Sequence, residues 1–263
     1  MTVCLFCRRE TEQFLQEEHI IPESLGNRTY VLPKGVVCDK CNNYFSKLDN
    51  YFCHYHLAAP QKLFGQYKTK KGNPPSMPLK QGEARQGKNG ELKLNQTLVI
   101  DTKSEQALLT FAGPKAELRL QYLLPDADSQ KISRFLAKVG MEILYLKVGE
   151  TAFKAEFDHL RHYGRYGIRH GIIPFLWCYQ QSQEIMLDTC TLNSKKHGKF
   201  FFGMIFLPGI LYLIPLNRTT DDYGVGFMQK FVTAGNKLNL CRDECLLKRS
   251  PIDISLQFEA KTK

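Results

Sequence analysis

The sequence predicts an α+β protein in which a small, metal-stapled N-terminal module precedes a larger region of mixed helices and strands. Three observations support this fold class. Two Cys-x-x-Cys pairs lie near the N-terminus, apolar residues recur at helical spacing over 129–147, and short apolar runs bounded by turn residues follow over 172–216. The chain has 263 residues, which is long enough for more than one domain.

The first pair is Cys4 with Cys7, the second is Cys38 with Cys41, and 30 residues separate them. Each pair lets one tight turn present two thiolates to an ion, and two such turns complete a tetrahedron. A module this short builds little core, so the metal would hold its fold. We therefore predict a structural Zn²⁺ with no ligand position left open for catalysis. The nine cysteines are an odd number and no export signal precedes them, so a disulfide framework is not expected.

Two further segments contain cysteine but form weaker metal candidates. Cys53-His54-Tyr55-His56 follows the second pair, and we expect these side chains to pack or to face solvent rather than to bind an ion. The segment 241–245 has one pair of cysteines without a second pair to complete a site. We therefore expect no second zinc.

Between the cysteine pairs lies Glu17-Glu18-His19-Ile20-Ile21-Pro22, and Asn42 follows the second pair directly. The order C-x-x-C, E-H-I-I-P, C-x-x-C-N resembles the zinc-containing branch of the HNH endonucleases, which have a ββα-metal fold. The resemblance is confined to the N-terminal module. It implies hydrolysis of DNA phosphodiester bonds that leaves 5′-phosphate and 3′-hydroxyl ends.

The chemistry explains these residue types, because cleaving a phosphodiester needs a nucleophilic water, a base and a cation. Histidine suits the base, since its pKa lies near neutrality, and hard oxygen ligands hold Mg²⁺ or Mn²⁺. The resemblance places the base on His19 and the metal ligands on Glu18 and Asn42. Glu17 and Asn43 remain alternatives to the two ligands, although neighbouring residues of a strand or helix face different directions.

One position departs from the family pattern. The middle residue of the family motif, usually Asn, helps to orient the base, and by spacing it falls near Pro33, which has no polar side chain. We expect Asn27 to take over this role, or a backbone carbonyl to hold the imidazole.

The charge is unevenly distributed along the chain. The net charge of +10 favours a polyanionic partner, here DNA, although a basic protein without such a partner has the same composition. Residues 1–57 contain six Lys/Arg against seven Asp/Glu, a net charge of −1, so the remainder carries +11. We expect most of the electrostatic contact with DNA to lie outside the N-terminal module.

Two segments supply candidate DNA contacts. Residues 58–90 are rich in Lys, Gly and Pro, are predicted to form a linker or loop, and include Lys70 and Lys71. Farther along, arginines recur every four residues among tyrosines, and they either clamp phosphates or are solvated cations at a helix end. These are Arg161, Arg165 and Arg169. The same two alternatives apply to Lys131, Arg134 and Lys138 on the 129–147 helix.

Residues 91–263 are predicted to form a mixed α+β domain for DNA binding or target selection. We expect a helix over 129–147, capped by Asp128 or Ser129 and ended by Gly149, and a second helix over 153–163. Expected strands are 92–94, 97–101, 107–111, 117–122, 172–179, 184–189, 199–206 and 210–216. A turn at 207–209 interrupts the apolar run 200–216, so we do not expect a membrane span.

The sequence therefore predicts a cytoplasmic, metal-dependent DNA endonuclease without a membrane partner. The expected setting is restriction or antiviral defence, with a homodimer or a partner protein in a defence complex as the assemblies to consider. The alternative is a non-catalytic zinc module that binds nucleic acid or a protein. The motifs do not specify a target sequence or a preference for DNA over RNA.

Overall fold

The structure is a computed structural model, and it shows the predicted mixture of helices and strands. Three of the predicted DNA contacts, Lys70, Lys71 and Arg169, lie outside the residues that it describes. The described residues are 2–55, 72, 76–79, 82–86, 92–96, 109–112, 115–122, 127–167, 173–180, 184–194, 198–217, 239–241, 246–247 and 252–259.

The N-terminal module consists of two short hairpins and a helix. Strand β1 (Thr2–Val3) pairs with β2 (Glu10–Thr11) around the first cysteine pair, and β3 (Glu18–His19) pairs with β4 (Val31–Leu32). A 3₁₀ turn, η1 (Glu23–Leu25), follows β3. Helix α1 (Asp39–Tyr55) begins within the second cysteine pair. The order β3, β4, α1 is the strand–strand–helix order of the predicted module.

The long predicted helix is present as α3 (Ser129–Val148). Its N-cap is Asp128, whose side chain accepts hydrogen bonds from the backbone N–H groups of Gln130 and Lys131, and Gly149 is its C-cap. The second predicted helix starts later than expected, as α4 (Asp158–Tyr166). Two 3₁₀ turns, η2 (Gly149–Phe153) and η3 (Ala155–Phe157), occupy the segment before it.

The strands after α4 form an antiparallel sheet, and the predicted runs at 172–179, 184–189, 199–206 and 210–216 all contribute to it. Pro208 and Gly209 form the predicted turn, which Leu207 and Ile210 close as paired residues. The described part of the chain contains no helix long and apolar enough to cross a membrane. In spatial order the strands are β12 (Met186–Ser194), β13 (Gly198–Leu207), β14 (Ile210–Pro215), β11 (Phe175–Tyr179) and β15 (Asn239–Cys241).

The remaining strands form smaller antiparallel groups. Two strands of the first group lie in the segment 58–90 that was predicted as a linker or loop. One group is β5 (Ser76–Leu79), β6 (Gly82–Gln86) and β7 (Leu92–Gln96). Another is β8 (Leu109–Ala112), β9 (Lys115–Tyr122) and β17 (Ile252–Glu259). The last is β10 (Ala127–Asp128) with β16 (Leu246–Leu247). The predicted strand at 97–101 lies outside the described residues.

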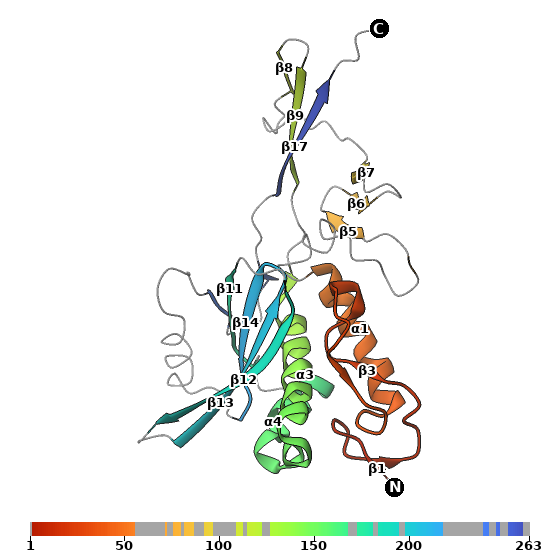
Figure 1. Ribbon diagram of the computed structural model, residues 1–263, viewed down its shortest axis with the longest axis vertical. Helices are drawn as coiled ribbons and strands as arrows, with labels where there is room; N and C mark the ends of the chain where they lie inside the picture. The colour runs from red at the N-terminus through yellow and green to blue at the C-terminus, as the bar shows by residue number, and fades with distance from the viewer. Residues whose placement is uncertain are drawn as a thin grey trace.

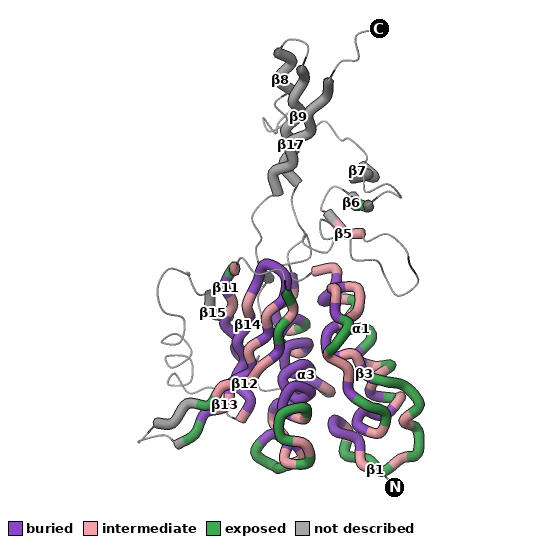
Figure 2. Tube along the Cα trace, viewed as in Figure 1, coloured by how far each residue is buried: buried purple, intermediate pink, exposed green. Residues whose placement is uncertain are grey.

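Helix α3 lies between α1 and the sheet, and most of its residues are buried (Figures 1 and 2). Phe135 of α3 stacks on Phe52 of α1 with ring centroids 3.7 Å apart. On the other side, a Cβ on Gly140 would lie 2.8 Å from the side chain of Leu216, so this glycine permits the close approach of helix and sheet. One hydrophobic cluster runs from Cys4 to Leu216, so the core is continuous across the predicted boundary at residue 57.

Candidate functional site

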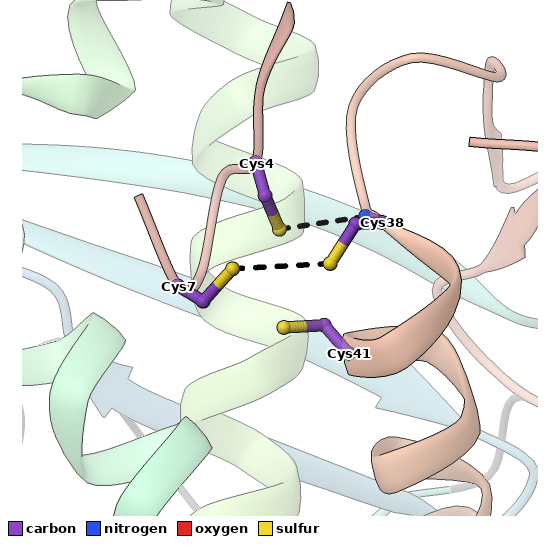
Figure 3. A group of neighbouring side chains, drawn as sticks. All are labelled: Cys4, Cys7, Cys38 and Cys41. Carbon is purple, nitrogen blue, oxygen red and sulfur yellow. Dashed lines mark hydrogen bonds between the residues drawn. The ribbon is translucent and has the colours of Figure 1, made fainter. Parts of the chain in front are cut away.

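The four cysteines of the two pairs converge at one point (Figure 3). Their Sγ atoms all lie within 4.8 Å of one another, and Cys7 Sγ is 3.8 Å from Cys38 Sγ. Tetrahedral Zn²⁺ with Zn–S bonds of about 2.3 Å places its sulfur ligands about 3.8 Å apart, so the four thiols fit this ion. Among the described residues, no other group of His, Cys, Asp and Glu side chains has a comparable arrangement.

Backbone hydrogen bonds hold the cysteines of the zinc site in position. The N–H groups of Cys41 and Asn42 both donate to the carbonyl of Cys38, so the second pair forms the first turn of α1. The backbone N–H of Cys38 donates to Cys4 Sγ at 3.4 Å. A hydrogen bond from Cys41 is the main cause that lowers the pKa of Cys4 to about 5. This shift favours the thiolate form of Cys4, which is the form that binds zinc.

Arg161 connects α4 to the first cysteine pair and is buried, in contrast to the predicted phosphate contact. Its Nε donates to the carbonyl of Leu5 at 2.7 Å, and Nη2 donates to the carbonyl of Ala152 at 2.6 Å. Nη1 forms an ion pair with Asp158. Burial lowers the pKa of Arg161 to about 10, so the group still carries its charge at neutral pH. Because these contacts use the guanidinium inside the protein, we no longer assign Arg161 to DNA.

Arg165 and Arg134 also contact the N-terminal module. Arg165 Nε donates to Cys41 Sγ at 3.3 Å, and its guanidinium lies 3.9 Å from the ring centroid of Tyr44. Arg134 donates to the hydroxyl of Tyr44 and to the carbonyl of Gly164. Lys131, in contrast, is half exposed beside Asp128, as expected for a solvated helix face. The two arginines therefore join α3 and α4 to α1.

Glu18 is the buried member of the Glu17-Glu18 pair. It is 3% exposed, whereas Glu17 faces solvent. Its Oε1 lies 2.6 Å from Lys138 Nζ. Its Oε2 is buried without a hydrogen-bond partner. Buried carboxylate oxygens are normally paired, so this oxygen is suited to a divalent cation and supports the choice of Glu18 over Glu17.

Asn42 is the residue after the second cysteine pair whose side chain contacts the residue just before β3. Its Nδ2 donates to the carbonyl of Glu17 at 3.2 Å. Asn43 is exposed. The side-chain position of Asn42 therefore supports it, rather than Asn43, as the partner of Glu18.

His19 lies beside Glu18 on β3, and its side chain is 26% exposed. Its Nε2 lies 3.8 Å from Oε1 of Glu23, and its Nδ1 is buried without a hydrogen-bond partner. Glu23 is 3.9 Å from Arg28 as well. Glu23 is not among the residues predicted from the sequence, and no sequence motif marks it as a partner of His19.

Asn27 holds the loop between β3 and β4 and does not orient His19. Its Nδ2 donates to the carbonyls of Ile21 and Tyr30 at 2.6 and 2.9 Å. Its Oδ1 accepts from the N–H groups of Thr29 and Tyr30. Because both amide hydrogens are used by the backbone, the prediction that Asn27 orients His19 is wrong.

Lys138 is fully buried, so the prediction that it contacts DNA or faces solvent is wrong. Its Nζ lies 3.2 Å from Asp49 Oδ1, 3.6 Å from Glu142 Oε2 and 3.2 Å from the carbonyl of His19, in addition to the contact with Glu18. Burial alone would lower the pKa of Lys138, but the carboxylates around it raise the pKa, so the ammonium stays charged. Burial raises the pKa of Asp49 to about 6.

Comparison with known proteins confirms the resemblance in the N-terminal region. Residues 4–55 match the family model of the HNH endonucleases. No curated protein and no solved structure matches the chain. The matched segment contains both cysteine pairs, Glu18, His19 and Asn42, whereas Lys138 and Arg161 lie beyond it.

Proposed function

We propose that the HNH segment at residues 4–55 makes this chain a metal-dependent endonuclease that hydrolyses DNA phosphodiester bonds. His19 is the general base, and Glu18 and Asn42 hold one Mg²⁺ or Mn²⁺. The observation that carries the proposal is the arrangement at β3. A buried carboxylate with one unpaired oxygen adjoins a partly exposed imidazole, and Asn42 donates a hydrogen bond to the residue just before this strand.

In this reaction His19 removes a proton from the attacking water. The carboxylate of Glu23, 3.8 Å from Nε2, stabilises the imidazolium that results. Since Nε2 faces Glu23, the unpaired Nδ1 of His19 is the nitrogen that accepts the proton, and Glu18 holds its ligand oxygen away from solvent. The divalent cation, when bound, stabilises the charge on the leaving oxygen.

The zinc has a separate, structural role in this proposal. Four cysteine ligands leave no position for water or substrate. Asn42 directly follows Cys41, and its N–H donates to the carbonyl of Cys38. Zinc binding therefore fixes the start of α1, and with it the position of the second ligand of the catalytic cation.

DNA binding and target choice are assigned to the rest of the chain, since residues 1–57 are nearly neutral and the remainder carries +11. Lys70, Lys71 and Arg169 stay in the proposal as DNA contacts. A role in restriction or antiviral defence, with a homodimer or a partner protein supplying the second strand cut, belongs to the same proposal.

The test uses the purified full chain loaded with zinc. Supercoiled plasmid, single-stranded DNA and RNA are each incubated with Mg²⁺, Mn²⁺ or a chelator of divalent cations that leaves the zinc bound. We expect nicking of DNA that requires Mg²⁺ or Mn²⁺. Asn42→Ala should lower the rate more than about tenfold, because it removes a ligand of the cation, and Asn43→Ala is the matched control.

Equal rates for these two variants, or no cleavage of any substrate by the wild type, would contradict the proposal. Binding of nucleic acid without cleavage would instead identify a non-catalytic zinc module.

A further inference from the structure

We infer that Lys138 is a positioning residue that holds Glu18 and His19 in place through one buried ammonium group. Lys138 belongs to α3, outside the segment that matches the HNH family. The inference rests on the proposed function, because it concerns the same site. It makes α3 an integral part of the catalytic unit.

The contacts of Lys138 Nζ match the bonding capacity of an ammonium group. Nζ lies 2.6 Å from Glu18 Oε1, 3.2 Å from the carbonyl oxygen of His19 and 3.2 Å from Asp49 Oδ1. An ammonium has three N–H donors, and these atoms are three acceptors. Since Glu18 and His19 are consecutive in β3, one group fixes the side chain of the first and the main chain of the second.

Lys138 engages Glu18 in a way that leaves a ligand oxygen available. The contact is with Oε1, while Oε2 is buried and has no hydrogen-bond partner. A bond to one oxygen restrains rotation of the carboxylate without occupying the other. Carboxylates that bind metals are commonly held by such outer contacts, and loss of these contacts weakens metal binding about 10–100-fold.

The packing around Lys138 explains why its ammonium has a fixed position. Its Nζ is 5.9 Å from the ring centroids of both Phe45 and Phe135. A Cβ on Gly164 of α4 would lie 3.2 Å from the backbone nitrogen of Lys138, so α4 packs closely against α3 here. A buried ion pair adds little net stability, because desolvation of the two charges opposes their attraction. The burial of Lys138 is therefore better explained by its hold on β3.

The charges around Lys138 allow two roles to be tested separately, namely the positioning of Glu18 and His19 and the neutralisation of the nearby carboxylates. One ammonium faces three carboxylates, Glu18 from β3, Asp49 from α1 and Glu142 from α3. Lys138→Met removes the ammonium and makes the group more negative by one charge. Lys138→Met combined with Asp49→Asn restores the original formal charge but lacks the bonds to Glu18 and His19.

The experiment measures Mn²⁺ binding to the zinc-loaded full chain by electron paramagnetic resonance, with thermal unfolding in parallel. We expect the wild type to bind Mn²⁺ in a manner that Glu18→Gln abolishes. Lys138→Met should weaken Mn²⁺ binding by about tenfold or more. The charge-matched double variant should regain thermal stability but not Mn²⁺ affinity. Ile143→Val, which loses one methylene at a buried position of α3, controls for destabilisation alone.

Wild-type Mn²⁺ affinity in the double variant would overturn the inference, because neutralisation would then suffice. The same holds for wild-type affinity in Lys138→Met, or for binding that is insensitive to Glu18→Gln. If Lys138→Met does not fold, the double variant carries the test. A wild-type chain that binds Mn²⁺ through Glu18 but cleaves no nucleic acid would refute the proposed function, and the Mn²⁺ affinities of the variants would still decide the role of Lys138.

Discussion

Replacing Arg161 with methionine should destabilise the protein without lowering the DNA affinity of the folded molecules. In the structure this guanidinium donates to the buried carbonyls of Leu5 and Ala152 and pairs with Asp158. Methionine retains part of the apolar stem but none of the donors. The first cysteine pair then loses its direct bond to α4.

The size of the expected change in the free energy of unfolding follows from the buried carbonyls of Leu5 and Ala152, which lose their donor. Hydrogen bonds from a charged group contribute about 1.5–3 kcal/mol each, and Arg161 makes two of them to buried carbonyls. Asp158 is partly exposed and recovers water, so its loss adds little. We therefore expect Arg161→Met to lower the free energy of unfolding by about 3–5 kcal/mol, the contribution of its two hydrogen bonds to buried carbonyls.

Urea unfolding in the presence of zinc measures this change, with the fluorescence of Trp177, the single tryptophan, as the probe. DNA affinity is measured by fluorescence anisotropy over a range of salt concentrations and is corrected for the folded fraction. Lys131→Met on the exposed face of α3 is the control for loss of a cation. A stability within about 1 kcal/mol of the wild type, together with a flatter salt dependence of DNA binding, would refute this reasoning and return Arg161 to the DNA interface.

Three further predictions follow from the same structure. Glu23→Gln should lower kcat for cleavage about tenfold with little change in KM, because a neutral amide does not stabilise the imidazolium of His19; an unchanged kcat would exclude this role. The raised pKa of Asp49 means that the folded state holds this proton more tightly than the unfolded state, so the stability that it contributes is present at low pH and is lost as the pH rises through about 6. The unfolding free energy of Asp49→Asn should therefore rise by about 1 kcal/mol relative to the wild type between pH 5 and 7, whereas a constant difference would be inconsistent with the shift. Phe135→Ala should lower the free energy of unfolding by about 3–5 kcal/mol, because it removes the stack on Phe52. Unfolding of α1 and α3 in two separate steps would argue against their shared core.

The sequence was sufficient for features that depend on local spacing. The two Cys-x-x-Cys pairs predicted a four-cysteine site because each pair is a single turn. The caps of α3 at Asp128 and Gly149 could be predicted because capping involves neighbouring residues. The turn at Pro208 and Gly209 followed from the conformational preferences of these residues.

The interior charges could not be predicted in the same way. Lys138 and Arg161 have the helical spacing of a solvated face, and their partners lie far away in the sequence. Lys138 contacts Glu18 from 120 positions away, and Arg161 contacts Leu5 across 156 positions. Only the packing of α3 and α4 on the N-terminal module brings these groups together. For Asn27, the sequence did not show that the backbone would use its whole amide group.

The most direct test of the catalytic assignment is Mg²⁺-dependent nicking of supercoiled plasmid by the wild type and by His19→Ala, with zinc content and circular dichroism measured on the same samples. We predict that the variant loses cleavage while it keeps the zinc content and the fold of the wild type, because His19 does not belong to the zinc site. Cleavage by His19→Ala at the wild-type rate would contradict the assignment of His19 as the general base.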